Sequence, residues 1–396
     1  MIYLHQTGCS EKGRSDNMTD VKKLMVPWLE DCIPFFSEYI EKAWENKNLS
    51  RMMANEMHLP PQKKVLDQLW EGVKQCHRYP DSLKQVKTII GELNGLSPDW
   101  VLLANGSNEA LDMAMRSFLR PGDAIIQSNP CYGIYAQRAA LIGAEIISID
   151  ALENWDYDMQ GIEASIGENT KIVIIANPNN PTGNLAPNLI IERLVTHNIV
   201  VICDEAYIEY SGLVNSKLEI MKNNPNMIIS RTLSKAYGLA GMRFGYLLGH
   251  PETIEIISRT MMFWNVSTIS AYGARAALLD QEGLRKNTSK CTEGRDYLER
   301  ELSKIDGLTV YHSHANYILL DATCFGESSK EIVDGLLEKH DIILRTVKPF
   351  KQKTGMVRVT VCGREENERC VKALRDYFGN KKGRAKGYSS LISNSD

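Results

Sequence analysis

A lysine surrounded by phosphate-binding residue types stands near the middle of the chain. Lys235 follows two hydroxyl residues, Thr232 and Ser234, and precedes a glycine-rich run that ends in Arg243. Hydroxyls, free backbone amides and an arginine fork are the groups that bind a phosphate. A lysine amine is nucleophilic only when it is deprotonated, which requires a desolvated or electropositive pocket. The stretch favours a lysine bonded to a phosphorylated aldehyde such as pyridoxal phosphate; the alternative is an exposed lysine in a Ser/Gly loop.

Three other polar loops follow short apolar runs. Gly106 and Ser107 open a predicted helix, whose free amides and dipole favour an anion by about 0.3–1 kcal/mol. The loop 177–183 presents amides such as that of Asn180 between prolines. Asp204 ends a further apolar run, and a carboxylate at a buried strand end is costly unless a cation, here a pyridinium nitrogen, pairs with it. Taken singly, each loop is also open to a structural explanation as a turn, a helix cap or an ion pair.

The apolar runs predict the elements that position these loops. Short runs rich in Ile and Val occupy 101–103, 124–126, 145–149, 171–176, 199–203 and 227–230, with plausible helices between them. This alternation predicts a sheet of buried, mostly parallel strands. Ligands of such sheets bind beyond the carboxyl ends of the strands, which is where the polar loops lie.

The pattern differs on either side of this region. Helical segments at 252–263, 270–279 and 288–305 lead to strand-like runs at 309–311, 317–320, 342–344 and 357–361, which predicts a smaller α+β unit. Upstream, apolar residues at helical spacing predict an amphipathic helix over 21–46, which Pro34 splits, and a second helix over 64–74. The residues 53–61, which end in two prolines, are expected to be a linker.

The expected fold class is therefore α/β, with a mostly parallel mixed sheet in a large domain and a smaller α+β domain. The expected parts are a mobile arm (1–17), an N-terminal helical segment that packs with the small domain (18–55), the large cofactor-binding domain (56–285), the small C-terminal domain (286–380) and a flexible tail (381–396).

Composition excludes several classes of function. The 396 residues carry a net charge of -3, whereas nucleic-acid and anionic-membrane proteins normally show a clear basic excess. The nine cysteines are scattered, without a C-x-x-C pair that would suggest zinc or a redox centre, so no metal is expected. No apolar run approaches the roughly 18 residues of a membrane helix, and the start has no signal-peptide core. A cytoplasmic protein with reduced cysteines is expected.

Taken in order, four motifs resemble those of fold-type I pyridoxal-phosphate enzymes. They are Asn105-Gly106-Ser107, the loop 177–183, Asp204-Glu205-Ala206-Tyr207, and Thr232-Leu233-Ser234-Lys235 through Arg243. The order and residue sequences of these motifs are most similar to those of class I/II aminotransferases of the histidinol-phosphate type, over roughly 55–377.

The resemblance implies a role for each cofactor-site residue. Lys235 would bond to the cofactor aldehyde and later move the proton between the substrate Cα and the cofactor C4′, and Asp204 would pair with the pyridinium nitrogen. The remaining cofactor contacts would be Tyr207 and Asn180 at the ring hydroxyl, Tyr132 stacked on the ring, Gly106, Ser107, Thr232, Ser234 and Arg243 at the phosphate, and Tyr79 at the phosphate of a neighbouring subunit. A homodimer with shared active sites would follow.

The resemblance also implies substrate residues, although here the chain departs from the family pattern. Arg358 alternates with apolar neighbours on a predicted strand and matches the arginine that grips the substrate carboxylate; Arg345 matches a position near the distal group. Asn55 opens the entrance segment and is expected to contact substrate, but its neighbours differ from the usual Asn-Glu-Asn-Pro type. Cys131 replaces the threonine usual before the stacking tyrosine. These differences leave the amino donor open.

The expected function is a homodimeric aminotransferase that exchanges amino and oxo acid substrates by ping-pong chemistry, with histidinol phosphate or an aromatic amino acid as the leading substrate. One alternative keeps the cofactor in a decarboxylase, an elimination enzyme or a cyclising lyase. A second is a non-catalytic, pyridoxal-phosphate-binding regulatory module, against which the intact Lys235 argues.

Overall fold

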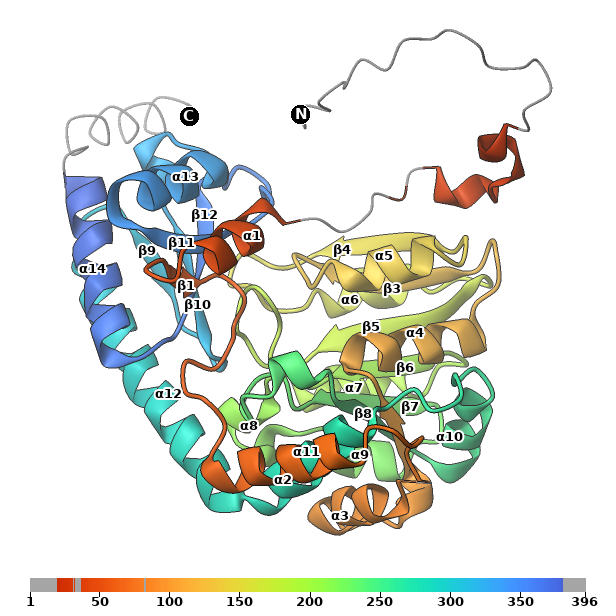
Figure 1. Ribbon diagram of the computed structural model, residues 1–396. Helices are drawn as coiled ribbons and strands as arrows, with labels where there is room; N and C mark the ends of the chain where they lie inside the picture. The colour runs from red at the N-terminus through yellow and green to blue at the C-terminus, as the bar shows by residue number, and fades with distance from the viewer. Residues whose placement is uncertain (1–19, 31, 33–36, 82, 380–396) are drawn as a thin grey trace, which may run out of the picture.

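The computed structural model describes residues 20–30, 32, 37–81 and 83–379 and contains two β-sheets (Figure 1). The strands of the larger sheet are β2 (Val101–Ala104), β3 (Ala124–Asn129), β4 (Glu145–Asp150), β5 (Thr170–Ala176), β6 (Val200–Asp204), β7 (Met227–Thr232) and β8 (Gly245–Gly249). Those of the smaller sheet are β1 (Ser50–Met52), β9 (Thr309–Tyr311), β10 (Tyr317–Asp321), β11 (Ile342–Thr346) and β12 (Met356–Thr360). The expected mobile arm and tail, and Pro34, lie outside the described residues.

Helices cover both sheets. The α-helices are α1 (Glu38–Glu45), α2 (Lys63–Lys74), α3 (Lys84–Asn94), α4 (Ser107–Phe118), α5 (Ile134–Ala140), α6 (Met159–Ala164), α7 (Asn188–Leu194), α8 (Ile208–Ser211), α9 (Leu218–Lys222), α10 (Pro251–Ser258), α11 (Thr268–Leu279), α12 (Gln281–Leu302), α13 (Ser329–His340) and α14 (Arg364–Gly379). Short 3-10 helices are η1 (Val21–Leu24), η2 (Pro27–Leu29), η3 (Pro98–Trp100), η4 (Leu213–Asn215), η5 (Ala240–Met242) and η6 (Thr323–Phe325). Among the described residues, no helix is both long enough and apolar enough to cross a membrane.

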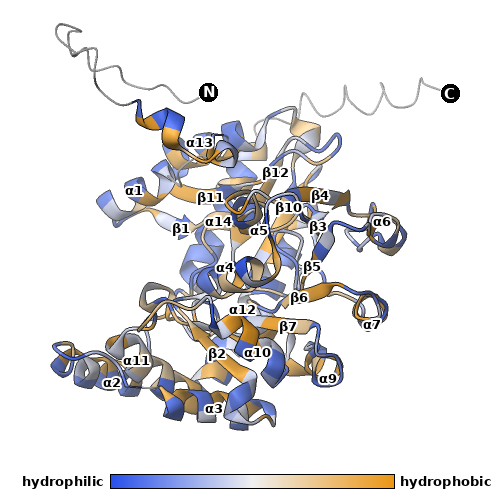
Figure 2. Cartoon of the chain, turned by 90° about the vertical axis from the view of Figure 1, so that its right-hand side faces the viewer, coloured by the Kyte–Doolittle hydropathy of each residue, from blue (hydrophilic) through white to orange (hydrophobic). Residues whose placement is uncertain are grey.

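The larger sheet has the order β2-β8-β7-β6-β5-β3-β4. All neighbouring pairs are parallel except the two that involve β8, which is antiparallel to both β2 and β7. The strands are buried on both faces because alternate side chains enter two different cores. Val201 and Cys203 of β6 face one core and Ile202 faces the other, as the period of two in a strand requires. In Figure 2, β2, β6 and β7 are accordingly hydrophobic over most of their length.

The register of this sheet brings the predicted loops to one edge. Ala104 at the end of β2 and Thr232 at the end of β7 both pair with Gly245, the first residue of antiparallel β8. Ala176 at the end of β5 pairs with Asp204 at the end of β6. The loops after β2, β5, β6 and β7 therefore open on the same side of the sheet, as expected for the carboxyl ends of parallel strands.

The smaller sheet has the order β1-β11-β12-β10-β9, and β1 pairs with β11 in parallel. Its core is completed by α12, α13 and α14. In Figure 1, α12 runs along the side of the molecule from the level of α11 to the small sheet. Residues 53–55 follow β1 and contact residues of both sheets' regions: Arg358 on β12, and Lys235 and Tyr207 in the loops after β7 and β6.

The sequence-based expectations hold for most elements and fail for some. The helix expected over 21–46 and split at Pro34 is wrong in its first part, because η1 and η2 are separate turns and α1 begins only at Glu38; Pro27 lacks the amide proton that a continuing helix requires. The helix expected over 252–263 ends at Ser258. Two strands were missed: β1, which is only three residues long, and β8, which is bounded by glycines. The domain boundaries at 55/56 and 285/286 stay predictions.

A buried ion pair joins the ends of two central strands. The Arg231 guanidinium donates to Oε2 of Glu205 through Nε (3.0 Å) and Nη2 (2.9 Å), and both side chains are at most 3% exposed. Arg231 Nη1 also donates to Asn94 of α3 at 2.8 Å, and Glu205 accepts from the Ser216 hydroxyl at 2.8 Å and the Lys217 amide at 2.6 Å. Every charged atom of this pair therefore has a partner, which is what the burial of two charges requires.

We predict that Arg231→Met lowers the free energy of unfolding by about 3–5 kcal/mol, because it leaves the Glu205 carboxylate buried without a cation. The double variant Arg231→Met/Glu205→Gln should recover most of this loss. The matched control is Arg259→Met, which breaks an exposed pair with Glu255 and should cost less than about 1 kcal/mol. Denaturant unfolding of the cofactor-free proteins measures all three, and equal losses for Arg231→Met and Arg259→Met would contradict the prediction.

Candidate active site

Lys235 lies in the loop after β7 with its amine held by the chain itself. Its Nζ donates to the carbonyl oxygen of Ala54 at 3.0 Å and lies 5.6 Å from the centroid of the Tyr207 ring. Desolvation, with smaller contributions from the charges of Arg358 and Arg243, lowers the pKa of Lys235 to about 8. The neutral, nucleophilic amine is therefore much more available near neutral pH than in a free lysine.

Asp204 presents one satisfied and one unsatisfied carboxylate oxygen. The buried hydroxyl of Tyr135 donates to Oδ2 at 2.6 Å, whereas Oδ1 is buried and has no hydrogen-bond partner in the part of the chain that the structure describes. Burial raises the pKa of Asp204 to about 6. A cationic N–H donor at Oδ1 would satisfy that atom and favour the ionised carboxylate.

The five residues predicted for the phosphate converge on one place. They are Gly106, Ser107, Thr232, Ser234 and Arg243. The Ser234 hydroxyl accepts from Thr232 Oγ1 at 3.0 Å and from Arg243 Nη1 at 3.2 Å. Ser107 begins the twelve-residue α4, so its free amides point to the same side. A side chain at Gly106, whose φ is +84°, would place its Cβ 2.4 Å from Arg243 Nη2, so only glycine leaves room beside the guanidinium.

The residues predicted around the cofactor ring lie beside these groups. The Tyr132 hydroxyl donates to Asn108 at 3.4 Å, and its ring meets that of Tyr135 edge to face at 5.8 Å. The Tyr207 hydroxyl accepts from the side-chain amide of Asn55 at 3.0 Å. Burial raises the pKa of both Tyr132 and Tyr207, so both phenols keep their protons near neutral pH.

Arg358 enters the site from the small sheet. Its Nη1 donates to Oδ1 of Asn180 and its Nη2 to the carbonyl of Met53 at 2.7 Å, while Nε is buried and without a partner among the described residues. The guanidinium lies 5.1 Å from the centroid of the Tyr317 ring. Residues from both sheets and from the segment between them therefore meet at this point.

Asn55 and Tyr79 occupy positions that the sequence alone did not indicate. Asn55 is 1% exposed, and its side chain contacts Tyr207 and Thr360, so its predicted contact with substrate stays a prediction. Tyr79 is 75% exposed and stacks on Trp264, with ring centroids 4.2 Å apart.

Several functional neighbours were missed from the sequence. Tyr135, which holds Asp204, lies one helical turn after Tyr132 in Tyr132-Gly133-Ile134-Tyr135, and that spacing was the available signal. Thr360, two residues after Arg358 on β12, shares its face of the strand and was open to the same argument. Nothing local pointed to Met53 and Ala54, because they contribute only backbone carbonyls.

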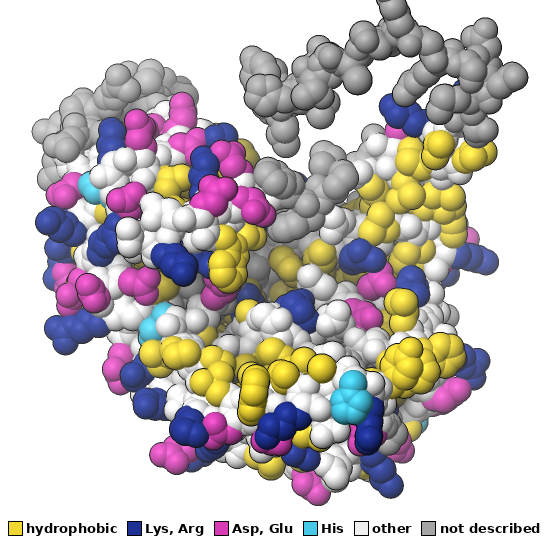
Figure 3. Space-filling view, in the orientation of Figure 1, with side chains coloured by type: hydrophobic (Ala, Val, Ile, Leu, Met, Phe, Trp, Pro, Cys, Tyr) yellow, Lys and Arg dark blue, Asp and Glu magenta, His cyan; other side chains and the backbone are white. Residues whose placement is uncertain are grey.

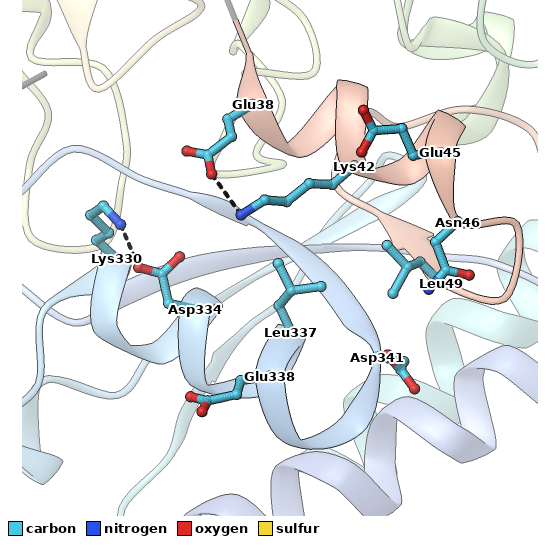
Figure 4. Close-up of a pocket in the computed structure, with 10 residues that line it drawn as sticks. All are labelled: Glu38, Lys42, Glu45, Asn46, Leu49, Lys330, Asp334, Leu337, Glu338 and Asp341. Carbon is cyan, nitrogen blue, oxygen red and sulfur yellow. Dashed lines mark hydrogen bonds and ion pairs between the residues drawn. The ribbon is translucent and has the colours of Figure 1, made fainter. Parts of the chain in front are cut away.

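A surface hollow of about 630 Å³ lies elsewhere, between α1 and α13 (Figure 4). Both of its lysines pair with acids of its lining: Lys42 with Glu38 at 2.6 Å, and Lys330 with Asp334. None of its lining residues contacts Lys235, so it is separate from the site described above.

Comparison with known proteins assigns the chain to a family. The profile described as aminotransferase class I and II matches residues 49–374. The chain belongs to that family. The histidinol-phosphate aminotransferase of Anaeromyxobacter sp. (strain Fw109-5) is 31% identical over 369 residues, which cover 90% of this chain and 99% of that protein. That of Methanothermobacter thermautotrophicus is 32% identical over 333 residues, covering 82% and 87%.

A solved structure agrees with this assignment. The histidinol-phosphate aminotransferase from Sinorhizobium meliloti in complex with pyridoxal-5'-phosphate has a TM-score of 0.80 at 27% identity, over 89% of this chain and 96% of that one. The predicted fold class, aminotransferase activity and cofactor are thus confirmed: the protein is a pyridoxal-phosphate-dependent, fold-type I aminotransferase.

The residues present fit pyridoxal phosphate. The unpartnered Oδ1 of Asp204 suits the protonated pyridine nitrogen, and the cradle beside Gly106 offers an arginine, hydroxyls and amides for the phosphate. When bound, the cofactor supplies an electron sink for the bond that breaks at the substrate Cα. Lys235 would hold the cofactor, and its free amine would move the proton at the substrate Cα, a role that its lowered pKa favours. Asp204 would carry its charge opposite the ring nitrogen, and Tyr132 and Tyr207 would orient the ring. These individual roles stay predictions.

The raised pKa of Asp204 predicts a pH dependence of the cofactor-free protein. Between its ordinary pKa of 3.8 and about 6 the native state binds more protons than the unfolded state, so stability falls as pH rises through this window. Asp204→Asn lacks this titrating group. The free energy of unfolding of the wild type, relative to that of the variant, should therefore decrease by on the order of 2–3 kcal/mol between pH 4 and 6. Unfolding curves of the two proteins across that range measure the difference. Parallel pH profiles would contradict it.

Proposed function

We propose that the amino substrate carries a phosphate monoester, as histidinol phosphate does. The observation that carries the proposal is a pair of arginines directly opposite each other: Arg345 on β11 is the register partner of Arg358 on β12. Opposite residues of antiparallel strands project to the same face, where two like charges repel. The charge of Arg345, added to the larger effect of burial, helps to lower the pKa of Arg358.

A bound anion would turn this repulsion into attraction. Within the described residues, the Arg345 guanidinium has no hydrogen bond or ion pair, and Arg358 keeps its buried Nε free. Two guanidinium groups are a suitable receptor for a group with nearly two negative charges and three acceptor oxygens. A single carboxylate would leave one arginine uncompensated. The relatives named above as histidinol-phosphate aminotransferases support the same substrate class.

We predict that Arg345→Gln raises KM for histidinol phosphate by about 10- to 100-fold, because it removes charge-assisted contacts with the phosphate. For a donor without a distal anion, such as phenylalanine, KM should change by less than about threefold. Steady-state kinetics on a panel of amino donors with an added 2-oxo acid measures both. Equal losses for phosphorylated and unphosphorylated donors would contradict the proposed substrate class.

Product analysis in the same assay tests the reaction type. Transamination yields one oxo product and one new amino acid for each amino donor consumed. Release of carbon dioxide or of an eliminated group instead would show the decarboxylase or lyase chemistry, which the same residues could support. Lys235→Ala, which cannot bond to the cofactor, is the inactive control.

We further propose a homodimer whose active sites are shared. The support is a set of exposed apolar side chains around Tyr79: Trp264, Phe263 and Met262 beside it, and Leu66, Trp70 and Val73 on α2. Figure 3 shows hydrophobic side chains gathered over α2. An exposed patch of this kind is typical of a protein interface. Tyr79 then contacts the phosphate of the neighbouring copy. The cytoplasmic location stays a prediction.

Subunit complementation tests the shared site. Tyr79→Ala should weaken cofactor binding, and Lys235→Ala should abolish covalent attachment. When the two variants are co-expressed, a mixed dimer contains one site with both native residues, so tight, borohydride-trappable cofactor should reappear. Cofactor content by mass spectrometry and particle mass by light scattering measure the outcome. A monomeric mass, or no recovery in the mixture, would contradict the proposal.

A further inference from the structure

Three consecutive residues between β1 and α2 each contact a different residue of the active site. The carbonyl of Met53 accepts from Arg358 at 2.7 Å, and the carbonyl of Ala54 accepts from Lys235 at 3.0 Å. The side-chain amide of Asn55 donates to the Tyr207 hydroxyl at 3.0 Å. We refer to residues 53–55 as the strap. Asn55 makes its contact through its own side chain, whereas Met53 and Ala54 use their backbone carbonyls. A substitution of Asn55 can therefore remove its contact while the two backbone contacts remain.

The conformation of Asn55 is strongly constrained. Its φ is +54°, in the left-handed region that asparagine tolerates better than most residues with a side chain. The Thr360 hydroxyl accepts from the Asn55 backbone amide at 3.0 Å and donates to Oδ1 at 3.1 Å. The Asn316 amide donates to the Asn55 carbonyl at 3.1 Å. With Oδ1 held by Thr360, the Nδ2 end of the side chain faces Tyr207.

The contact with Asn55 fixes the direction of the Tyr207 hydroxyl proton. A phenol has one proton to donate, and an N–H donor at its oxygen forces that proton to point elsewhere. Within the described part of the chain, no carbonyl or carboxylate accepts a hydrogen bond from this hydroxyl. The charged groups near Tyr207 are Lys235, Arg358 and Asp204. Three other tyrosines interact with it: Tyr132, Tyr210 and Tyr317, the last of which meets its ring edge to face at 5.0 Å.

We propose that Asn55 is a positioning residue: by donating to the Tyr207 oxygen, its clamped amide aims the Tyr207 proton at the cofactor ring oxygen. Asn55 is thereby assigned to Tyr207 rather than to the substrate, because both ends of its amide already have partners in the protein. The inference rests on the cofactor and on no particular substrate, so it stands whether or not the phosphate-bearing substrate is correct. It also links the substrate arginine to the cofactor, since Thr360 and Arg358 lie on one strand, two residues apart.

The absorbance titration of the bound cofactor tests this assignment. A weaker donor at the ring oxygen leaves more negative charge there, so the link between Lys235 and the cofactor holds its proton to higher pH. Asn55→Gly keeps the positive φ while removing the amide, and should raise the titration midpoint by about 0.5–1 pH unit. Tyr207→Phe should raise it further. In the Tyr207→Phe background, Asn55→Gly should produce no additional shift.

Two outcomes with Asn55→Gly would overturn the proposal. One is an unchanged midpoint in Asn55→Gly together with a raised KM for the amino donor, which would make Asn55 a substrate ligand. The other is an equal shift with and without the Tyr207 hydroxyl, which would indicate a general structural effect. A matched pair covers the case in which Asn55→Gly does not fold: Thr360→Val, which releases the clamp, should raise the midpoint, and Thr360→Ser, which keeps the hydroxyl, should not. Equal midpoints for this pair would likewise overturn the proposal.

Discussion

The burial of a carboxylate at the end of a central strand is the constraint on which the site depends. Asp204 ends β6, where both faces of the sheet are covered, and among the described residues its buried Oδ1 has no hydrogen-bond partner. A buried, half-satisfied carboxylate is costly, and its raised pKa expresses that cost. The cofactor's protonated ring nitrogen would remove this cost by supplying the missing N–H and a positive charge. We therefore expect cofactor binding and the stability of the sheet edge to be coupled, because one atom of the protein would serve both.

The neighbouring carboxylate shows the opposite solution. Glu205 follows Asp204 directly but projects to the other side, where Arg231, Ser216 and the Lys217 amide satisfy it completely. Two adjacent acids thus have different tasks: one holds strands β6 and β7 together, and the other is left open for a ligand. The alternation of side chains along an extended chain makes this separation possible, since consecutive residues cannot share a face.

Where Arg358 and Arg345 lie, the uncompensated charge is positive rather than negative. Arg358 is buried, its Nε has no partner in the part of the chain that the structure describes, and Arg345 lies opposite it on the next strand. The strap moderates this excess of positive charge, because its carbonyl oxygens lie on Arg358 and Lys235. A segment with no charged side chain at these positions therefore participates in the electrostatics of the site through its backbone. It also ties the small sheet, through Thr360 and Asn55, to the tyrosine beside the cofactor.

The sequence by itself indicated the cofactor chemistry and most of the strands that carry it. Gly106, Ser107 and Asp204 were identifiable because each lies at or just after the end of an apolar run, and the edge of a parallel sheet brings together the loops that leave its strands. Lys235 was identifiable from the hydroxyl residues before it and the glycine-rich run after it, which ends in Arg243. Tertiary structure alone decided the partners: Tyr135 on Asp204, Asn55 on Tyr207, the strap carbonyls on Lys235 and Arg358, and Arg345 opposite Arg358. These contacts join segments that are distant in the chain or use backbone atoms common to every residue. No local pattern encodes them, because they arise from how two sheets and the segment between them pack.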